Sequence, residues 1–197
     1  MKYCKGKVLT ALILTLLLAI GICAGRDKPT DADRVWIKLE GQPVAIILTI
    51  PDGFCGIAWG TPPDNTGWWQ TLQREERLPS GIVYSAQYQA VVDATDLLGD
   101  IRQDKQADIY YHYNKKTEVL GVSLAALHFS GEDSVRQVKT VLMQQYGEPS
   151  AVQEVHQDSE SRLEYCWYGK QTSIRFAPAS DRLKATVVVF ATKDLDI

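Results

Sequence analysis

The sequence predicts an α+β fold of two layers, in which two helices cover one face of a mostly antiparallel sheet. β-rich segments joined by short turns recur along the 197-residue chain and predict hairpins. An amphipathic pattern over residues 132–146 predicts a helix, and a weaker pattern predicts another over residues 64–77. Hairpins favour antiparallel pairing, and an amphipathic helix buries its apolar stripe against such a sheet.

The first 25 residues have the pattern of an export signal. Three lysines precede an apolar run at 8–22, and small residues follow this run. Two alternatives stay open, namely an uncleaved membrane anchor through residues 8–24 and a lipid anchor on Cys23. All three alternatives place the protein in the periplasm or outside the cell. A flexible tether at 26–33 then leads into a single domain at 34–197.

A hairpin opens the domain, and a helix is expected to follow it. Strands at 34–40 and 44–50 flank a Gly-Gln-Pro turn. In the segment 64–77, polar residues at the start can cap a helix, and Trp68 and Leu72 are four residues apart. This segment is therefore predicted to form the first helix.

The middle of the chain is predicted to supply strands. Alternation of apolar and polar residues predicts a strand at 82–92. Residues 93–106 are polar and predict a loop. A second hairpin joins strands at 107–114 and 117–129 around a lysine-containing turn.

Residues 132–146 carry the clearest helix pattern. Apolar positions recur at intervals of three and four residues, at Val135, Val138, Leu142 and Tyr146. Ser130 and Asp133 have the spacing of an acidic capping box, and Gly147 favours a left-handed stop. Three strands are expected after the helix, at 162–168, 172–177 and 183–191.

A helix followed by a meander is thus predicted twice. The segments IYYHYNKKTEVLGVSL and LEYCWYGKQTSIRFAP both consist of an aromatic strand, a lysine-containing turn and an apolar strand. We interpret residues 54–129 and 130–192 as the two halves of a degenerate tandem of helix-plus-meander units.

The charge of the domain restricts its partners. Residues 1–25 contain three lysines and no acid, so removing them changes the net charge from −3 to −6. An acidic domain without a basic cluster argues against nucleic acid and against contact with anionic lipid. We therefore expect no nucleic-acid partner and no membrane contact beyond an N-terminal anchor.

No pattern typical of an enzyme site is present in the sequence. The chain lacks a nucleophile elbow, a P-loop, the dinucleotide-binding glycines and the zinc-protease helix pattern. The three histidines are spread along the chain, and the aspartates between 93 and 108 match no calcium-loop spacing. We expect no catalytic residue, no cofactor and no metal.

Aromatic residues are the remaining candidates for a binding surface. Trp69, Tyr84, Tyr88 and Tyr111 are interpreted as candidate contact residues, because Trp and Tyr are frequent in interface hot spots. The alternative is that these rings fill the core between helix and sheet. On the helical interpretation of 64–77, Trp68 packs inward beside Leu72 and Trp69 is exposed.

Cys55 and Cys166 are the two cysteines that remain if the export signal is removed. An oxidising compartment permits a disulfide between them. Two separate thiols are the alternative, because the sequence does not show how close the residues lie.

The segment FCGIAWG resembles an F-x-G-I-x-W-G opening found in exported bacterial proteins of unknown function. The matching residues are Phe54, Gly56, Ile57, Trp59 and Gly60, then Tyr111 and Tyr113, then Tyr146, Gly147, Glu148 and Pro149. The layout is also similar to that of β-lactamase inhibitory protein and of the small outer-membrane assembly lipoproteins. This resemblance implies a helix-plus-meander binding module and transfers no functional residue.

The sequence therefore favours a non-enzymatic binding or interaction module of the cell envelope, acting on an unknown envelope protein or ligand. The alternative is a small periplasmic hydrolase or ligand-binding protein. A perturbed acid or histidine beside a nucleophile in a pocket would favour the alternative.

Overall fold

The computed structural model describes residues 33–39, 42–99, 101, 106–157, 160–179 and 181–191. The predicted export signal at 1–25 and all but the last residue of the predicted tether lie outside these residues, as do Cys23, Asp100 and Asp104. In the part of the chain that the structure describes, no helix has the length and apolar character needed to cross a membrane.

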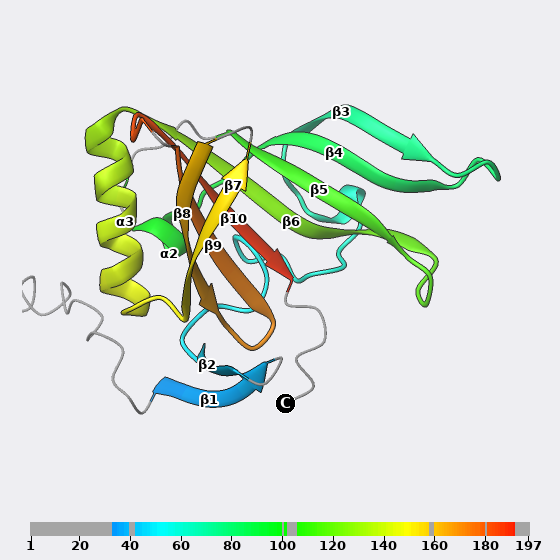
Figure 1. Ribbon diagram of the computed structural model, residues 1–197. Coiled ribbons are helices and arrows are strands. Elements are labelled where there is room, and N and C mark those ends of the chain that lie inside the picture. The colour runs from blue at the N-terminus through cyan, green and yellow to red at the C-terminus, as the bar shows by residue number, and fades with distance from the viewer. Residues whose placement is uncertain are drawn as a thin grey trace, which may run out of the picture.

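One mixed sheet of ten strands forms the body of the molecule (Figure 1). Nine strands follow the order β1-β2-β8-β9-β10-β6-β5-β4-β3, and β7 pairs with β8 beside this path. Among the described pairings only β2 with β8 is parallel. The strands are β1 Arg34–Leu39, β2 Gln42–Ile47, β3 Gln70–Arg77, β4 Val83–Val91, β5 Gln106–Asn114, β6 Val119–Ser130, β7 Ala151–Gln157, β8 Glu160–Tyr168, β9 Thr172–Pro178 and β10 Lys184–Ala191.

The predicted α+β class is wrong, because the fold is β-rich. Helices account for 16% of the described residues and strands for 55%. The described helices are α3 (Glu132–Tyr146), the short α2 (Thr95–Leu98) and a 3₁₀ turn, η2 (Pro63–Asn65). The predicted helix at 64–77 does not exist, so the first half of the proposed tandem lacks its helix.

Residues 70–77 form strand β3 instead of a helix. The spacing of four between Trp68 and Leu72 is an even number, so it also places both residues on one face of a strand. Gly67 has a φ of 71°, which stops the 3₁₀ turn after Thr66. The segment then pairs with β4 over its whole length, and this long-range pairing outweighs the local preference for helix.

The two predicted hairpins, the strand at 82–92, the helix at 132–146 and the three C-terminal strands are confirmed. Strand β7 was not predicted, and the predicted loop at 93–106 contains α2.

The predicted capping box at the start of α3 is not formed. Gly131 is the N-cap of α3, no side chain caps the helix, and Asp133 binds Arg136. Gly147 ends the helix with a φ of 71°, as expected.

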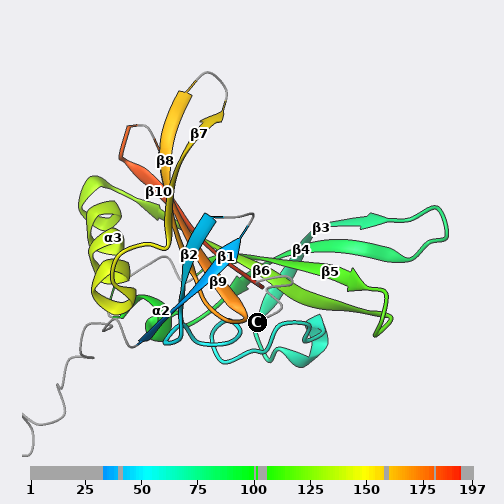
Figure 2. The same cartoon turned by 60° about the horizontal axis from the view of Figure 1, so that its bottom comes forward.

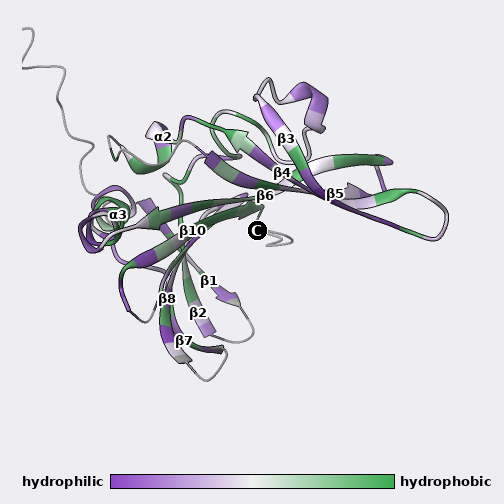
Figure 3. Cartoon of the chain, turned by 90° about the horizontal axis from the view of Figure 1, so that it is seen from above, coloured by the Kyte–Doolittle hydropathy of each residue, from purple (hydrophilic) through white to green (hydrophobic). Residues whose placement is uncertain are grey.

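The core lies between α3 and one face of the sheet. The predicted stripe of α3 is buried there, and Val138 and Leu142 have no exposed surface. The Trp167 side chain of β8 is also fully buried, and its indole nitrogen donates a hydrogen bond of 2.9 Å to the Gly147 carbonyl. Figure 3 shows α3 on one side of the β6–β10 part of the sheet, with β7 and β8 bending away from it.

The segment FCGIAWG folds into a loop that packs against the core. Phe54 and Ile57 form a backbone bridge, and Gly60 donates a backbone hydrogen bond of 2.8 Å to Val122 of β6. The Trp59 indole and the Gly53 backbone N–H both donate to the Thr172 hydroxyl at 2.9 Å. The loop is therefore fixed to β6 and β9, at the end of the molecule that comes forward in Figure 2.

Candidate functional site on the helix-free face

The face of the sheet opposite α3 carries the polar groups that are candidates for function. Successive side chains of a strand point to opposite faces, so the neighbours of core residues on β8, β9 and β10 point away from α3. No described helix lies on this side, and we call it the helix-free face. It includes Asp108 of β5, His128 of β6, Arg162, Glu164 and Cys166 of β8, Arg175 of β9 and Thr186 of β10.

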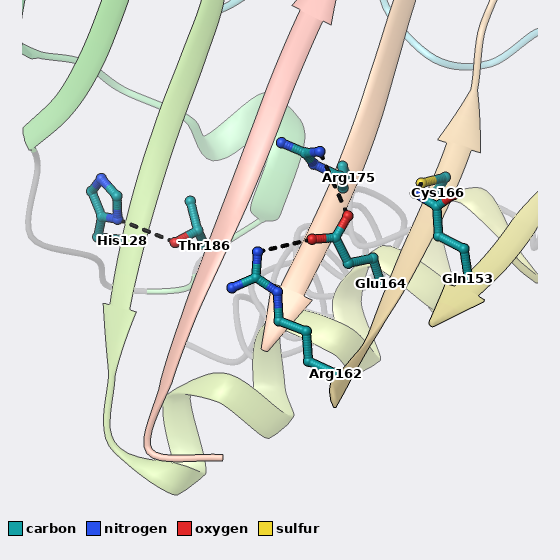
Figure 4. Close-up of polar contacts among 7 residues, drawn as sticks. All are labelled: His128, Gln153, Arg162, Glu164, Cys166, Arg175 and Thr186. Atoms are coloured by element: carbon teal, nitrogen blue, oxygen red, sulfur yellow. Dashed lines mark hydrogen bonds and ion pairs between the residues drawn. The ribbon is translucent and has the colours of Figure 1, made fainter. Parts of the chain in front are cut away.

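A buried carboxylate lies between two arginines on this face. The side chain of Glu164 is 3% exposed, whereas those of Arg162 and Arg175 are 34% and 39% exposed. Arg162 Nη2 donates to Glu164 Oε1 at 3.0 Å, and Arg175 Nη1 lies 3.5 Å from Oε2. Figure 4 shows the two guanidiniums on either side of the carboxylate, both extending toward β10. The pairing explains how a strand interior accommodates a buried acid.

A second polar chain crosses three neighbouring strands. His128 Nε2 lies 3.1 Å from Asp108 Oδ2, and His128 Nδ1 lies 3.3 Å from the Thr186 hydroxyl (Figure 4 shows the His128–Thr186 contact). The order acid, imidazole, hydroxyl is that of a hydrolase relay. The imidazole is more than half exposed, and Thr186 does not line the cavity described below.

Trp69 lies on the helix-free face, at the far end of the same sheet. The backbone N–H of Val91 donates to the Trp69 carbonyl, while Gln70 pairs with the core residue Ala90, so Trp69 points away from the core. Its side chain is 75% exposed. The exposure of Trp69 agrees with the expectation from sequence, although strand alternation is the cause.

Two of the other three predicted contact residues, Tyr88 and Tyr111, point to the opposite face. Tyr111 is fully buried, and its hydroxyl donates to Gln70 at 2.8 Å. Tyr88 is half-buried and packs edge-to-face on Tyr111 with ring centroids 5.2 Å apart. Tyr84 is partly exposed near the β3–β4 turn. The structure thus does not bring the tyrosines together with Trp69, and Tyr111 belongs to the core.

Cys55 and Cys166 are both free cysteines in the structure, which therefore has the two separate thiols and not the possible disulfide. Cys55 packs against the helix-side core, whereas Cys166 points to the helix-free face. Burial raises the pKa of the Cys55 thiol to about 12, with added repulsion from Asp93 and Asp96. Burial also raises the pKa of Cys166. Both thiols are therefore protonated at neutral pH and are weak nucleophiles.

A cavity of about 130 Å³ lies beside the FCGIAWG loop. Cys55, Asp52, Asp96 and Thr172 contribute its polar groups. No group of three or more histidine, cysteine or acidic side chains suited to a metal is found among the described residues. Asp93, from the predicted acidic loop, accepts hydrogen bonds from Thr95.

Sequence reasoning missed Arg162, Glu164, Arg175 and Thr186 as a group, because they come together only through strand pairing. A signal was present in RLEYCWY, where Glu164 lies between apolar and aromatic residues. Such an acid requires a partner if it is buried. Comparison of the chain with protein-family models, with curated proteins and with solved structures finds no match.

Proposed function

We propose that this protein is an exported, non-enzymatic binding module of the cell envelope, whose helix-free face contacts a partner protein. The observation that carries the proposal is the position of Trp69 on the same face as Arg162 and Arg175. Trp and Arg are the residue types most enriched in interface hot spots. The exposed Trp69 indole also leaves a large apolar surface in contact with water, which is costly.

The chemistry of the site supports binding over covalent catalysis. The two described thiols have raised pKa values and lack activation. The apparent export signal at 1–25 supports a location in the envelope. The resemblance of the FCGIAWG opening to exported proteins points the same way.

Trp36 offers a matched control for Trp69. Its side chain is 67% exposed, nearly as much as that of Trp69. Trp36 pairs with Ala45 of β2, on the same face as the core residue Ile47. Trp36 and Trp69 therefore have the same side chain but lie on different faces.

The test is capture of a partner from the producing cell's envelope with the full chain, using a photo-crosslinker at the exposed position 71 beside Trp69. We expect Trp69→Ala to weaken capture of the crosslinked protein by at least about 30-fold, the effect of a hot spot worth about 2 kcal/mol. Trp36→Ala is expected to leave capture unchanged. Equal effects of the two variants, or no crosslinked protein, would contradict the proposal.

Hydrolysis is the second candidate function, because Asp108, His128 and Thr186 form an acid–imidazole–hydroxyl chain. A hydrolase of this kind loses nearly all activity when its nucleophile is removed. Esterase assays of the wild type and Thr186→Val decide between the two functions. Activity abolished by Thr186→Val would favour the hydrolase, and the absence of activity in both proteins favours the binding module.

A further inference from the structure

The arginine pair of the helix-free face has more positive charge than its carboxylate neutralises. Arg162 and Arg175 together carry two positive charges, and the Glu164 carboxylate between them carries one negative charge. The remaining ion pairs described on the chain involve other residues. The cluster therefore retains a net charge of +1 in a domain that is acidic overall.

The two guanidiniums also have N–H donors that do not contact Glu164. Each uses a single terminal nitrogen to contact Glu164, Nη2 in Arg162 and Nη1 in Arg175. The Nε–H groups of both arginines are buried and have no hydrogen-bond partner among the described residues. Buried donors without a partner are rare in native proteins, and each costs free energy until a ligand or water satisfies it.

We propose that Arg162 and Arg175 bind one carboxylate of the partner protein, either a side-chain carboxylate or its C-terminal carboxylate. This inference rests on the proposed function and names the group that the helix-free face recognises. A guanidinium presents its donors in a planar fork that matches a carboxylate. One monovalent carboxylate brings the cluster to neutrality, whereas a phosphate dianion leaves it negative.

The burial of Glu164 keeps its carboxylate away from an incoming anion. The Glu164 side chain is 3% exposed, whereas a third or more of each arginine side chain remains exposed. Figure 4 shows both guanidiniums extending over the sheet toward β10, where Thr186 lies. An external carboxylate therefore meets the arginines first, and the buried acid holds them in place.

The experiment measures binding of N-acetylglycine, a mimic of a C-terminal carboxylate, to the full chain by NMR titration, with N-acetylglycinamide as the uncharged control. Acetate represents a side-chain carboxylate. We expect weak binding of both carboxylates, with a Kd of about 1 mM, and none of the amide. Arg162→Gln and Arg175→Gln are each expected to weaken carboxylate binding about tenfold, which corresponds to about 1.4 kcal/mol.

Arg74→Gln is the matched control variant, because Arg74 is an exposed arginine of β3 that forms an ion pair with Glu76. It is expected to leave binding unchanged. Folding of every variant is checked by circular dichroism. Absence of carboxylate binding in the wild type, or equal effects of Arg74→Gln and the two cluster variants, would overturn the inference.

Glu164→Gln tests the charge argument, since it raises the net charge of the cluster from +1 to +2. If this variant folds, it is expected to bind inorganic phosphate at pH 8 at least tenfold more tightly than the wild type does. Unchanged phosphate binding would overturn the argument from charge. If the variant unfolds, the arginine variants decide alone.

The two proposals fail in different ways. Carboxylate binding without a Trp69-dependent crosslink would leave the anion site intact and remove the protein-binding function. A Trp69-dependent crosslink without carboxylate binding would remove only the inference about the arginines.

Discussion

Cys55 shows how position controls the chemistry of a single side chain. It lies in a loop with a φ of 48°, beside a cavity and near two aspartates. Burial and the nearby carboxylates both disfavour the thiolate, so the pKa rises from 9.0 to about 12. The sequence identified this residue as a candidate for a disulfide, but it contains no information on the burial that sets its pKa.

The raised pKa predicts a pH dependence of stability. The unfolded chain releases the Cys55 proton near pH 9, whereas the folded chain retains it until about pH 12. The unfolded state therefore binds fewer protons in this interval, and the free energy of unfolding falls as the pH rises, by at most about 1.4 kcal/mol per pH unit. Below pH 9 the contribution is fully present.

The measurement is urea unfolding at several pH values between 7.5 and 10.5, with wild type and Cys55→Ala. The buried tyrosines with raised pKa titrate in both proteins, so the difference between the two slopes belongs to Cys55. We expect a shallower slope in the variant. Identical slopes would show that the thiol ionises in the folded protein as it does in the unfolded chain.

The elements that depend on local pattern were predictable from sequence. The β5–β6 hairpin has alternating strands joined by a turn, and the helix α3 has an apolar stripe and a glycine stop signal. In each element these signals lie within a few residues of each other. The structure of the segment 64–77 was not predictable, because its pattern fits both a helix and a strand. Pairing with β4 makes residues 70–77 a strand. The arginine cluster depends on the register of the β8–β9 hairpin, which the predicted strand bounds alone do not specify.

The FCGIAWG loop and the glycine that precedes it give a prediction about Gly53 and Gly56. Gly53 and Gly56 both have positive φ, +90° and +76°, so alanine is strained at each position. A Cβ at Gly53 would lie 2.2 Å from the Ile57 carbonyl oxygen, whereas a Cβ at Gly56 meets nothing within 4 Å. We expect Gly56→Ala to cost about 1 kcal/mol of stability and Gly53→Ala to cost about 1–3 kcal/mol more, because of the clash.

Urea unfolding of the two variants measures this difference. Because both carry the same side chain on similar backbone conformations, their difference isolates the contact with Ile57. Equal losses would mean that the loop relaxes around the new methyl group and that its conformation is not fixed by the Phe54–Ile57 bridge.

The whole molecule is held together by contacts between segments far apart in the sequence. The central pair of the sheet joins β6 to β10, and the N-terminal hairpin reaches the rest through β2 and β8. The helix α3 covers the core that these strands form, together with Leu97 and Leu98 of the short helix α2. Such an order cannot be read from hairpin patterns, which specify neighbours along the chain and leave the order of hairpins open.

This arrangement predicts that one position in α3 controls the stability of the entire fold. Val138 is fully buried in the cluster that joins α3 to β4, β5, β6, β8, β9 and β10. An aspartate there is a buried charge without a partner, which costs about 3–5 kcal/mol, comparable with the total stability of many domains. We expect Val138→Asp to unfold the domain, as measured by the loss of far-ultraviolet circular dichroism and of a cooperative urea transition.

Val152→Asp is the matched control, because Val152 of β7 is half-exposed and the chemical change is identical. It is expected to cost no more than about 1 kcal/mol, the range of strand propensity at a surface position. If Val138→Asp retains a cooperative transition close to that of Val152→Asp, the sheet is stable without α3. The helix-free face would then owe its geometry to strand pairing alone, since it lies on the side of the sheet opposite α3.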